Sequence, residues 1–161
     1  MSLKIAAAKS ASTHIQIVAR TDSFSSEGLG AAITRAQKYV EAGADIVFAD
    51  GLSKKYDFQN FASGVGAPAL ANMTEFGKTP YYTGQQFEEM GYKIVIWPVS
   101  QLRVALKAIE ELYLIIRTED GTKSQEHKMK TRAQLYDLIG YFNYEALDTS
   151  IIKTVLPSAA E

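Results

Sequence analysis

Apolar residues gather in two kinds of segment, short β-branched runs and longer stretches with helical spacing. The short runs end at polar residues, among them Arg20, Asp50 and Asn72. Continuous apolar runs of this length are typical of strands buried in parallel sheets. We therefore predict four strands, at 15–19, 46–49, 68–71 and 93–97.

Each predicted strand is followed by a helical pattern. The helices are expected at 27–40, 53–65 and 83–90, and a longer one follows Ser100, which is the expected cap. The order strand–helix therefore occurs four times. It predicts an α/β fold built as one parallel half of a TIM-type (β/α) barrel, with four βα units.

The segments outside these units are also helical or polar. The apolar residues of 4–11 predict the tail of a helix that starts abruptly, which suggests truncation. Glu119–Lys130 has no hydrophobic period and is expected to be a mobile loop, and Arg132–Lys153 is expected to be a helical tail with apolar surface that needs a partner. We expect two parts, residues 1–120 with the βα units and 121–161 with the loop and a tail packed on a partner subunit.

Length and composition limit the possible functions of the protein. With 161 residues the chain is shorter than a complete barrel of about 250 residues. A half barrel leaves strand edges and one sheet face uncovered, so the chain must associate, open its sheet or belong to something longer. A net charge of -1 argues against nucleic acid and anionic membranes as partners. A small molecule or another protein is therefore the expected partner. The absence of cysteine and of a long apolar run favours a cytoplasmic protein.

The polar strand ends are the best candidates for chemistry. Arg20 suits a carboxylate or an enolate oxygen because its guanidinium offers two parallel donors, but it could equally pair with Asp22. Asp50 could be a helix cap, and Asn72 and Thr74 could simply end their strand. Arg103, near a helix start where the dipole disfavours a cation, favours an anion-binding role.

The other motifs in the sequence give little evidence for a function. His14 and His127 lack metal-ligand spacing to a second histidine or a cysteine, and exposed histidines are the default. The glycines at 28 and 30 lack the third glycine of a dinucleotide fingerprint, and the sequence has neither a phosphate loop nor a G-x-S-x-G elbow.

Four stretches carry a family resemblance: 17–22 (IVARTD), 40–45 (VEAGAD), 71–80 (ANMTEFGKTP) and 131–145, which runs from TRAQLY to YE. They resemble the C-terminal half of the 2-methylisocitrate lyase family, within the isocitrate lyase and phosphoenolpyruvate mutase superfamily. The resemblance implies a Mg²⁺-dependent lyase of propionate catabolism that cleaves 2-methylisocitrate, a tricarboxylate, to pyruvate, a 2-keto acid, and succinate. It also implies a homo-oligomer.

The resemblance assigns roles to particular residues. Arg20 would be catalytic, contacting the enolate and carboxylate region of the substrate. The substrate pocket would be lined by Asn72, Met73 and Thr74, and Arg103 and Arg132 would bind the distal carboxylates. Cations aimed at the developing oxyanion and at the carboxylates suit a retro-aldol cleavage.

Two departures from the family pattern limit this expectation. Asp50 stands where the family normally has a glutamate, so its carboxylate reaches less far toward the substrate by one methylene. The family's serine–glycine–glycine loop, metal-binding aspartates and cysteine–glycine–histidine loop belong to an N-terminal half that this sequence lacks. We therefore expect the isolated chain to be inactive and to contain no direct Mg²⁺ ligand.

Two alternatives to a lyase fragment stay open. One is another enzyme of the superfamily, similar to oxaloacetate decarboxylases or to phosphonate-processing enzymes. The other is a non-catalytic assembly module that pairs through its strand edges and its tail.

Overall fold

The computed structural model describes residues 1–12 and 14–151. They form two compact units, Met1–Leu106 and the residues from Lys107 onward, which are described separately. The last two residues of the predicted tail, Ile152 and Lys153, lie outside the described part of the chain.

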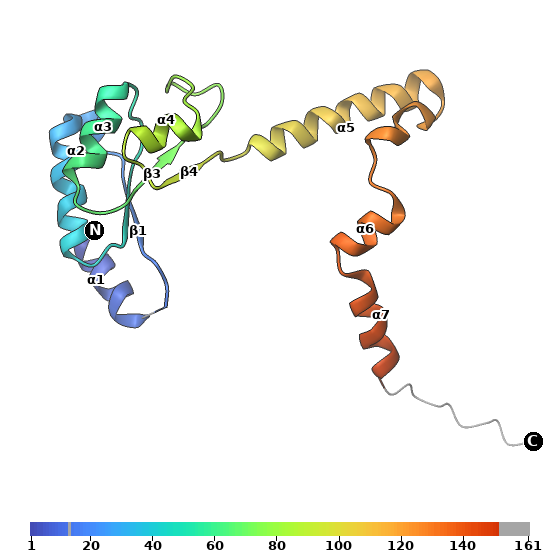
Figure 1. Ribbon diagram of the computed structural model, residues 1–161, viewed down its shortest axis with the longest axis horizontal. Helices are drawn as coiled ribbons and strands as arrows, with labels where there is room; N and C mark the ends of the chain where they lie inside the picture. The colour runs from blue at the N-terminus through green and yellow to red at the C-terminus, as the bar shows by residue number, and fades with distance from the viewer. Residues whose placement is uncertain (13, 152–161) are drawn as a thin grey trace, which may run out of the picture. The chain divides into compact units, whose positions relative to one another are not determined.

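The first unit is built on one parallel sheet (Figure 1). Its strands are β1 (Val18–Thr21), β2 (Ile46–Ala49), β3 (Ala69–Asn72) and β4 (Ile94–Ile96), and they lie side by side in chain order. All three neighbouring pairs are parallel. This arrangement confirms the predicted α/β fold with four βα units.

The first strand begins three residues later than the sequence pattern predicts. Its register with β2 pairs Val18 with Ile46 and Thr21 with Ala49, which brings Arg20 and Thr21 into the strand. Ile15, which was expected to begin it, is 62% exposed. Pairing with the neighbouring strand therefore sets the limits of β1, and the apolar run alone does not.

Four helices precede or follow the strands and cover one face of the sheet (Figure 1). They are α1 (Ser2–Ala11), α2 (Phe24–Glu41), α3 (Lys55–Gly64) and α4 (Gly84–Glu89). On the covered face, Val47 and Ala71 pack in one core with Phe61 of α3 and Phe87 of α4. Burial of the apolar side chains in this core, the phenylalanines above all, is the main favourable contribution to the fold of this unit.

Alternate residues of the strands face away from these helices. Successive strand side chains point to opposite faces, so Val18, Arg20, Phe48, Leu70 and Ile96 share the second face. Val18 is 45% exposed and Ile96 is 38% exposed. Within the described residues this apolar face is only partly covered, as expected for half of a barrel.

Helix α2 differs from the prediction at its start. It begins at Phe24 rather than at Glu27, and Gly28 interrupts it with a φ of 81°. A side chain is strained at positive φ, whereas glycine is not, so the first turn and the main part of the helix join at this residue.

Helix α5 (Ser100–Glu119) runs from the first unit into the second. Ser100 was expected to cap it, but this residue is the first of the helix and its hydroxyl donates to the Glu75 carboxylate. The segment after α5 was expected to be a loop. It contains instead a 3₁₀ helix, η1 (Lys123–Lys128), with an ion pair between Lys123 and Glu126.

The expected tail consists of two helices, α6 (Arg132–Leu138) and α7 (Tyr141–Ser150). They are separated at Gly140, whose φ is 63°. The second unit exposes a set of large apolar side chains: Ile109, Tyr113, Ile116, Leu135, Leu138, Ile139, Phe142, Tyr144 and Leu147. Among the described helices, none is both long and apolar enough to cross a membrane.

Candidate functional site

Three of the candidate residues lie together at the carboxyl end of the sheet. Arg20 is the third residue of β1, Asp50 follows β2 directly, and Asn72 is the last residue of β3. The alternation of strand side chains places all three on the face opposite the helices. The backbone N–H of Asp50 donates to the carbonyl of Thr21 at 3.0 Å, which holds the first two strand ends together.

Arg20 is bound by two carboxylates. Its Nη2 lies 2.6 Å from Oδ1 of Asp22 and 2.9 Å from Oδ2 of Asp50. The hydrogen bond to Asp22 and the negative charge of Asp50 raise the pKa of Arg20, and the same hydrogen bond lowers the pKa of Asp22. The guanidinium carbon also lies 5.1 Å from the centre of the Phe48 ring. Arg20 thus has the local Asp22 pairing considered from sequence, and a second carboxylate from the next strand.

At the end of β3, Asn72 and Thr74 lie at the rim of the sheet, whereas Met73 lies in the core. Thr74 donates its hydroxyl hydrogen to Oδ1 of Asn72 at 2.8 Å, so these two side chains form one polar group. Met73, between them, is 1% exposed and belongs to the apolar core, where its sulfur accepts the backbone N–H of Tyr82. The structure therefore brings Asn72 and Thr74 together and points Met73 away from them.

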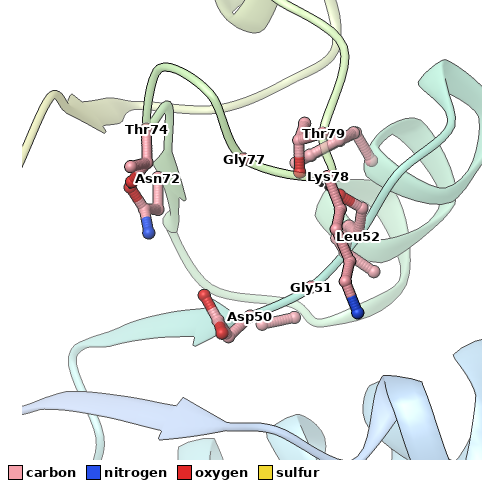
Figure 2. A pocket seen from close by; sticks show the side chains of 10 residues that line it. Asp50, Gly51, Leu52, Asn72, Thr74, Gly77, Lys78 and Thr79 are labelled. Carbon is pink, nitrogen blue, oxygen red and sulfur yellow. Dashed lines mark hydrogen bonds between the residues drawn. The ribbon is translucent and has the colours of Figure 1, made fainter.

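A pocket of about 210 Å³ opens beside these residues. Figure 2 shows the carboxylate of Asp50 and the amide of Asn72 on one side of it and the side chain of Lys78 on another. Thr79 fixes the loop that forms this last wall, because its hydroxyl donates to the carbonyl of Leu52 at 2.7 Å. Ligand sites are usually roughly 300–1,000 Å³, so this pocket has the size of part of a site.

The two remaining arginine candidates are not among the residues that line this pocket. Nη1 of Arg103 donates to the carbonyl of Glu75 at 2.8 Å and lies 3.3 Å from its carboxylate. Two contacts from Ser100 to the same carboxylate, and then the charge of Arg103, lower the pKa of Glu75. Arg132 is an exposed residue at the start of α6 in the second unit.

The described residues provide no cluster of three or more acidic, histidine or cysteine side chains that could hold a metal ion. Asp50, the acidic residue in the pocket, already pairs with Arg20. The donor set at this rim therefore suits an anionic ligand bound by guanidinium, amide and hydroxyl groups, rather than a metal held by this part of the chain alone.

Sequence reasoning missed two residues of this region. Lys78 lines the pocket, and Glu75 binds both Ser100 and Arg103. Both follow the asparagine at the end of β3 within a few residues, so their place in the loop after a polar strand end was an available signal. The partner on α5, however, is 28 residues from Glu75 and no local pattern indicates it.

Comparison with known proteins assigns the chain to a family. The model of the phosphoenolpyruvate phosphomutase family matches residues 1–116. The 2-methylisocitrate lyase of Bacillus subtilis (strain 168) is 50% identical over 157 residues, which are 98% of this chain and 52% of that protein. The 2-methylisocitrate lyase of Aeropyrum pernix is 51% identical over 148 residues, 92% of this chain and 48% of that protein.

A solved structure agrees with these relatives. The crystal structure of 2,3-dimethylmalate lyase, a member of the phosphoenolpyruvate mutase and isocitrate lyase superfamily, is 27% identical and superimposes with a TM-score of 0.78. The match covers 92% of this chain and 54% of that one. The chain therefore spans about half the length of the proteins that it matches.

Proposed function

Because the chain belongs to the phosphoenolpyruvate phosphomutase family, we propose that it forms half of a carbon–carbon lyase that cleaves 2-methylisocitrate to pyruvate and succinate. The observation that carries this proposal is the group of Arg20, Asp50 and Asn72 at one rim of a parallel sheet. The 50% identity to the Bacillus subtilis 2-methylisocitrate lyase, over 98% of this chain and 52% of that protein, supports this choice of substrate.

The chemistry of this cleavage explains the choice of side chains. A base removes the hydroxyl proton of the substrate, and the bond breaks between the hydroxyl-bearing carbon and the neighbouring carbon that becomes part of succinate. The hydroxyl-bearing carbon becomes the keto carbon of pyruvate, and the electron pair moves onto the succinate half, which an acid then protonates. Negative charge thus develops on carboxylate oxygens. A positioned guanidinium and an amide stabilise such charge, and we assign this role to Arg20 and Asn72. Arg103 and Arg132 bind the outer carboxylates in this proposal.

The acid for that final step comes from outside this chain in our proposal. The family resemblance implies a cysteine as the acid, and the sequence has no cysteine. The resemblance also implies Mg²⁺, but the side chains of the described residues do not fit a metal by themselves, since no three acidic, histidine or cysteine side chains cluster there. We propose that its ligands belong to the other half of the enzyme, and that the 161-residue chain alone does not turn over 2-methylisocitrate.

A chimera tests the proposal. The C-terminal half of the Bacillus subtilis 2-methylisocitrate lyase is replaced by this chain, and pyruvate formation from 2-methylisocitrate is measured beside the parent enzyme and the isolated chain. We expect turnover by the chimera and none by the isolated chain. A folded chimera without turnover, or steady turnover by the isolated chain, contradicts the proposal.

Two variants of the chimera distinguish the site from general damage. Arg20→Ala removes a charge-assisted hydrogen bond and should lower kcat/KM by about 100-fold. Arg35→Ala is the matched control, because Arg35 pairs with Glu27 on the exposed side of α2. It should leave kcat/KM within about twofold of the parent chimera. Equal losses in both variants would argue against Arg20 as a catalytic residue.

A second candidate is a lyase for a related hydroxy acid. Two observations favour it: Asp50 stands where the resemblance implies a glutamate, and the structural neighbour at 27% identity is a 2,3-dimethylmalate lyase. The same chimera assayed with 2,3-dimethylmalate decides between the two. A higher kcat/KM for that substrate than for 2-methylisocitrate selects the second candidate.

We also propose that the protein is a cytoplasmic homo-oligomer. The support for assembly is the set of exposed apolar side chains on α6 and α7, including Leu138, Phe142 and Leu147. Removing such a surface from water is favourable, and patches of this kind often mark subunit contacts. Light scattering after size exclusion measures the state directly, and a monodisperse monomer would contradict it.

A further inference from the structure

Glu75 joins the loop after β3 to the first turn of α5. Its two carboxylate oxygens accept the hydroxyl of Ser100 at 2.7 and 2.8 Å. Its backbone carbonyl accepts Nη1 of Arg103 at 2.8 Å, and its Oε2 lies 3.3 Å from the same nitrogen. Both the main chain and the side chain of Glu75 therefore bind Arg103.

Both of these contacts of Arg103 are made by the same guanidinium nitrogen, Nη1. Among the described residues, neither Nε nor Nη2 of Arg103 donates a hydrogen bond to another residue. The Nε–Nη2 edge is one of the edges that bind a carboxylate with two parallel hydrogen bonds. The contact with Glu75 therefore fixes the guanidinium while leaving this edge for a ligand.

The backbone around the contact is held in an unusual conformation. Phe76, next to Glu75, has a φ of 61°, and Val99, next to Ser100, has a φ of 58°. Non-glycine residues in this region cost of order 1 kcal/mol or more each and persist where surrounding contacts determine them. The 96% exposed Phe76 ring also lies 5.4 Å from the Arg103 guanidinium carbon. Such conformations are common at ligand sites.

The same loop serves the pocket. Asn72 and Thr74 line it, and Glu75 is the next residue. Glu75 thus connects the pocket lining, along the chain, with Arg103.

We propose that Glu75 is a positioning residue that holds Arg103 at the rim of the sheet, with its Nε–Nη2 edge presented to a carboxylate of the substrate. This inference rests on the proposed function, since it takes the ligand to be a di- or tricarboxylate. The competing interpretation is that Glu75 only fastens the start of α5 through Ser100.

The test uses the full 161-residue chain, with ¹⁵N-labelled arginine side chains observed by NMR and succinate as the probe. Three proteins are compared: the wild type, Glu75→Gln and Ser100→Ala. Glu75→Gln keeps the shape of the side chain and removes its charge. Ser100→Ala is the matched control because it removes the other partner of Glu75 and leaves the contacts of Arg103 in place.

In the wild type we expect a slowly rotating Arg103 guanidinium whose Nε signal shifts saturably with succinate. In Glu75→Gln we expect faster rotation and about tenfold weaker succinate binding, the scale of one charge-assisted hydrogen bond. Ser100→Ala should keep both properties within about twofold. Thermal unfolding of all three proteins shows whether the fold is retained, and Glu75→Asp provides rescue if Glu75→Gln does not fold.

Three results overturn the inference. They are unchanged Arg103 rotation and succinate affinity in Glu75→Gln, equal losses in Ser100→Ala, and no response of the wild-type Arg103 signal to succinate. Failure of the proposed function has a different signature: an inactive chimera, with the Arg103 readouts of the isolated chain unaffected.

Discussion

Arg20 and Asp50 form an ion pair between neighbouring strand ends, with Nη2 of the arginine 2.9 Å from Oδ2 of the aspartate. The pair joins the end of β1 to the residue after β2, and Asp22 binds the same guanidinium nitrogen at 2.6 Å. A ligand carboxylate at this rim must therefore share or displace carboxylates of the protein. Asp50 is half-buried, so its contact is the less hydrated of the two.

The first prediction concerns the charge of Asp22. The hydrogen bond from Arg20 lowers the pKa of Asp22, so Arg20→Ala should raise this pKa toward the ordinary value. NMR titration of the Asp22 carboxyl carbon measures it. The stability change should stay below about 1 kcal/mol because both side chains are largely exposed. An unchanged Asp22 titration in the variant would show that the pair does not form in solution.

The second prediction concerns the length of the carboxylate at position 50. In the chimera, Asp50→Glu should raise kcat/KM for 2-methylisocitrate by about tenfold or more, because misplacement of a catalytic group by about 1 Å costs up to about 100-fold. The control is Asp57→Glu, which lengthens a carboxylate by the same methylene in the first turn of α3, where it accepts the backbone N–H of Lys54. A lower kcat/KM in Asp50→Glu would indicate that the protein is adapted to aspartate and to a different substrate.

The third prediction concerns the hydroxyl of Tyr92. This residue is 3% exposed, and its hydroxyl has no hydrogen-bond partner within the described part of the structure. Burial alone raises the pKa of Tyr92. Tyr92→Phe removes an unsatisfied polar atom and keeps the ring, so the free energy of unfolding should rise by about 1 kcal/mol. Urea unfolding measures it, and a clear loss of stability would reveal a partner for the hydroxyl.

The fourth prediction concerns the core under the sheet. Phe87 is fully buried and packs edge-to-face on Phe58 and Tyr92, with ring centres 5.3 and 5.7 Å apart. Phe87→Ala should lower the free energy of unfolding by about 3–5 kcal/mol because it leaves a cavity. Tyr56→Ala, at a 69% exposed position on α3, should change it by less than about 0.5 kcal/mol. Similar losses in the two variants would contradict the assigned core.

The fifth prediction concerns pH and the amino end of the sheet. The backbone N–H of Ile17 and the Lys9 ammonium bind Asp45 and lower its pKa. Because the pKa is lower in the folded state, this stabilisation is complete above the unfolded carboxyl pKa of about 4 and is lost as pH falls through the folded value. Urea unfolding from pH 7 to pH 3 should show a gap between wild type and Asp45→Asn that narrows with acid. A constant gap would rule out a titrating Asp45.

Much of the first unit could be predicted from the sequence because its signals are local. The run Ile46–Ala49 matches β2 residue for residue, and the helix expected at 83–90 agrees with α4 (Gly84–Glu89) to within one residue at each end. The limits of β1 could not be predicted, since they depend on the register with β2. The break of α2 at Gly28 was missed because the apolar spacing that predicted this helix begins at Leu29, after the break.

The candidate site likewise contains some residues that could be predicted from the sequence and others that could not. Arg20, Asp50 and Asn72 were predictable because parallel strands bring their carboxyl ends to one edge. The contact between Glu75 and Arg103 joins residues from different βα units, and its formation depends on the path of two loops. Residues that act through a distant partner leave no periodic signal in a single sequence.

The strands of the sheet lie in the order in which they occur in the chain, and this order affects how the protein folds. Each strand finds its neighbour in the very next βα unit, so every pairing closes only a short stretch of polypeptide and the entropy lost in each closure is small. A nascent chain can therefore add one unit after another to the growing sheet during synthesis, without waiting for a distant segment to emerge from the ribosome.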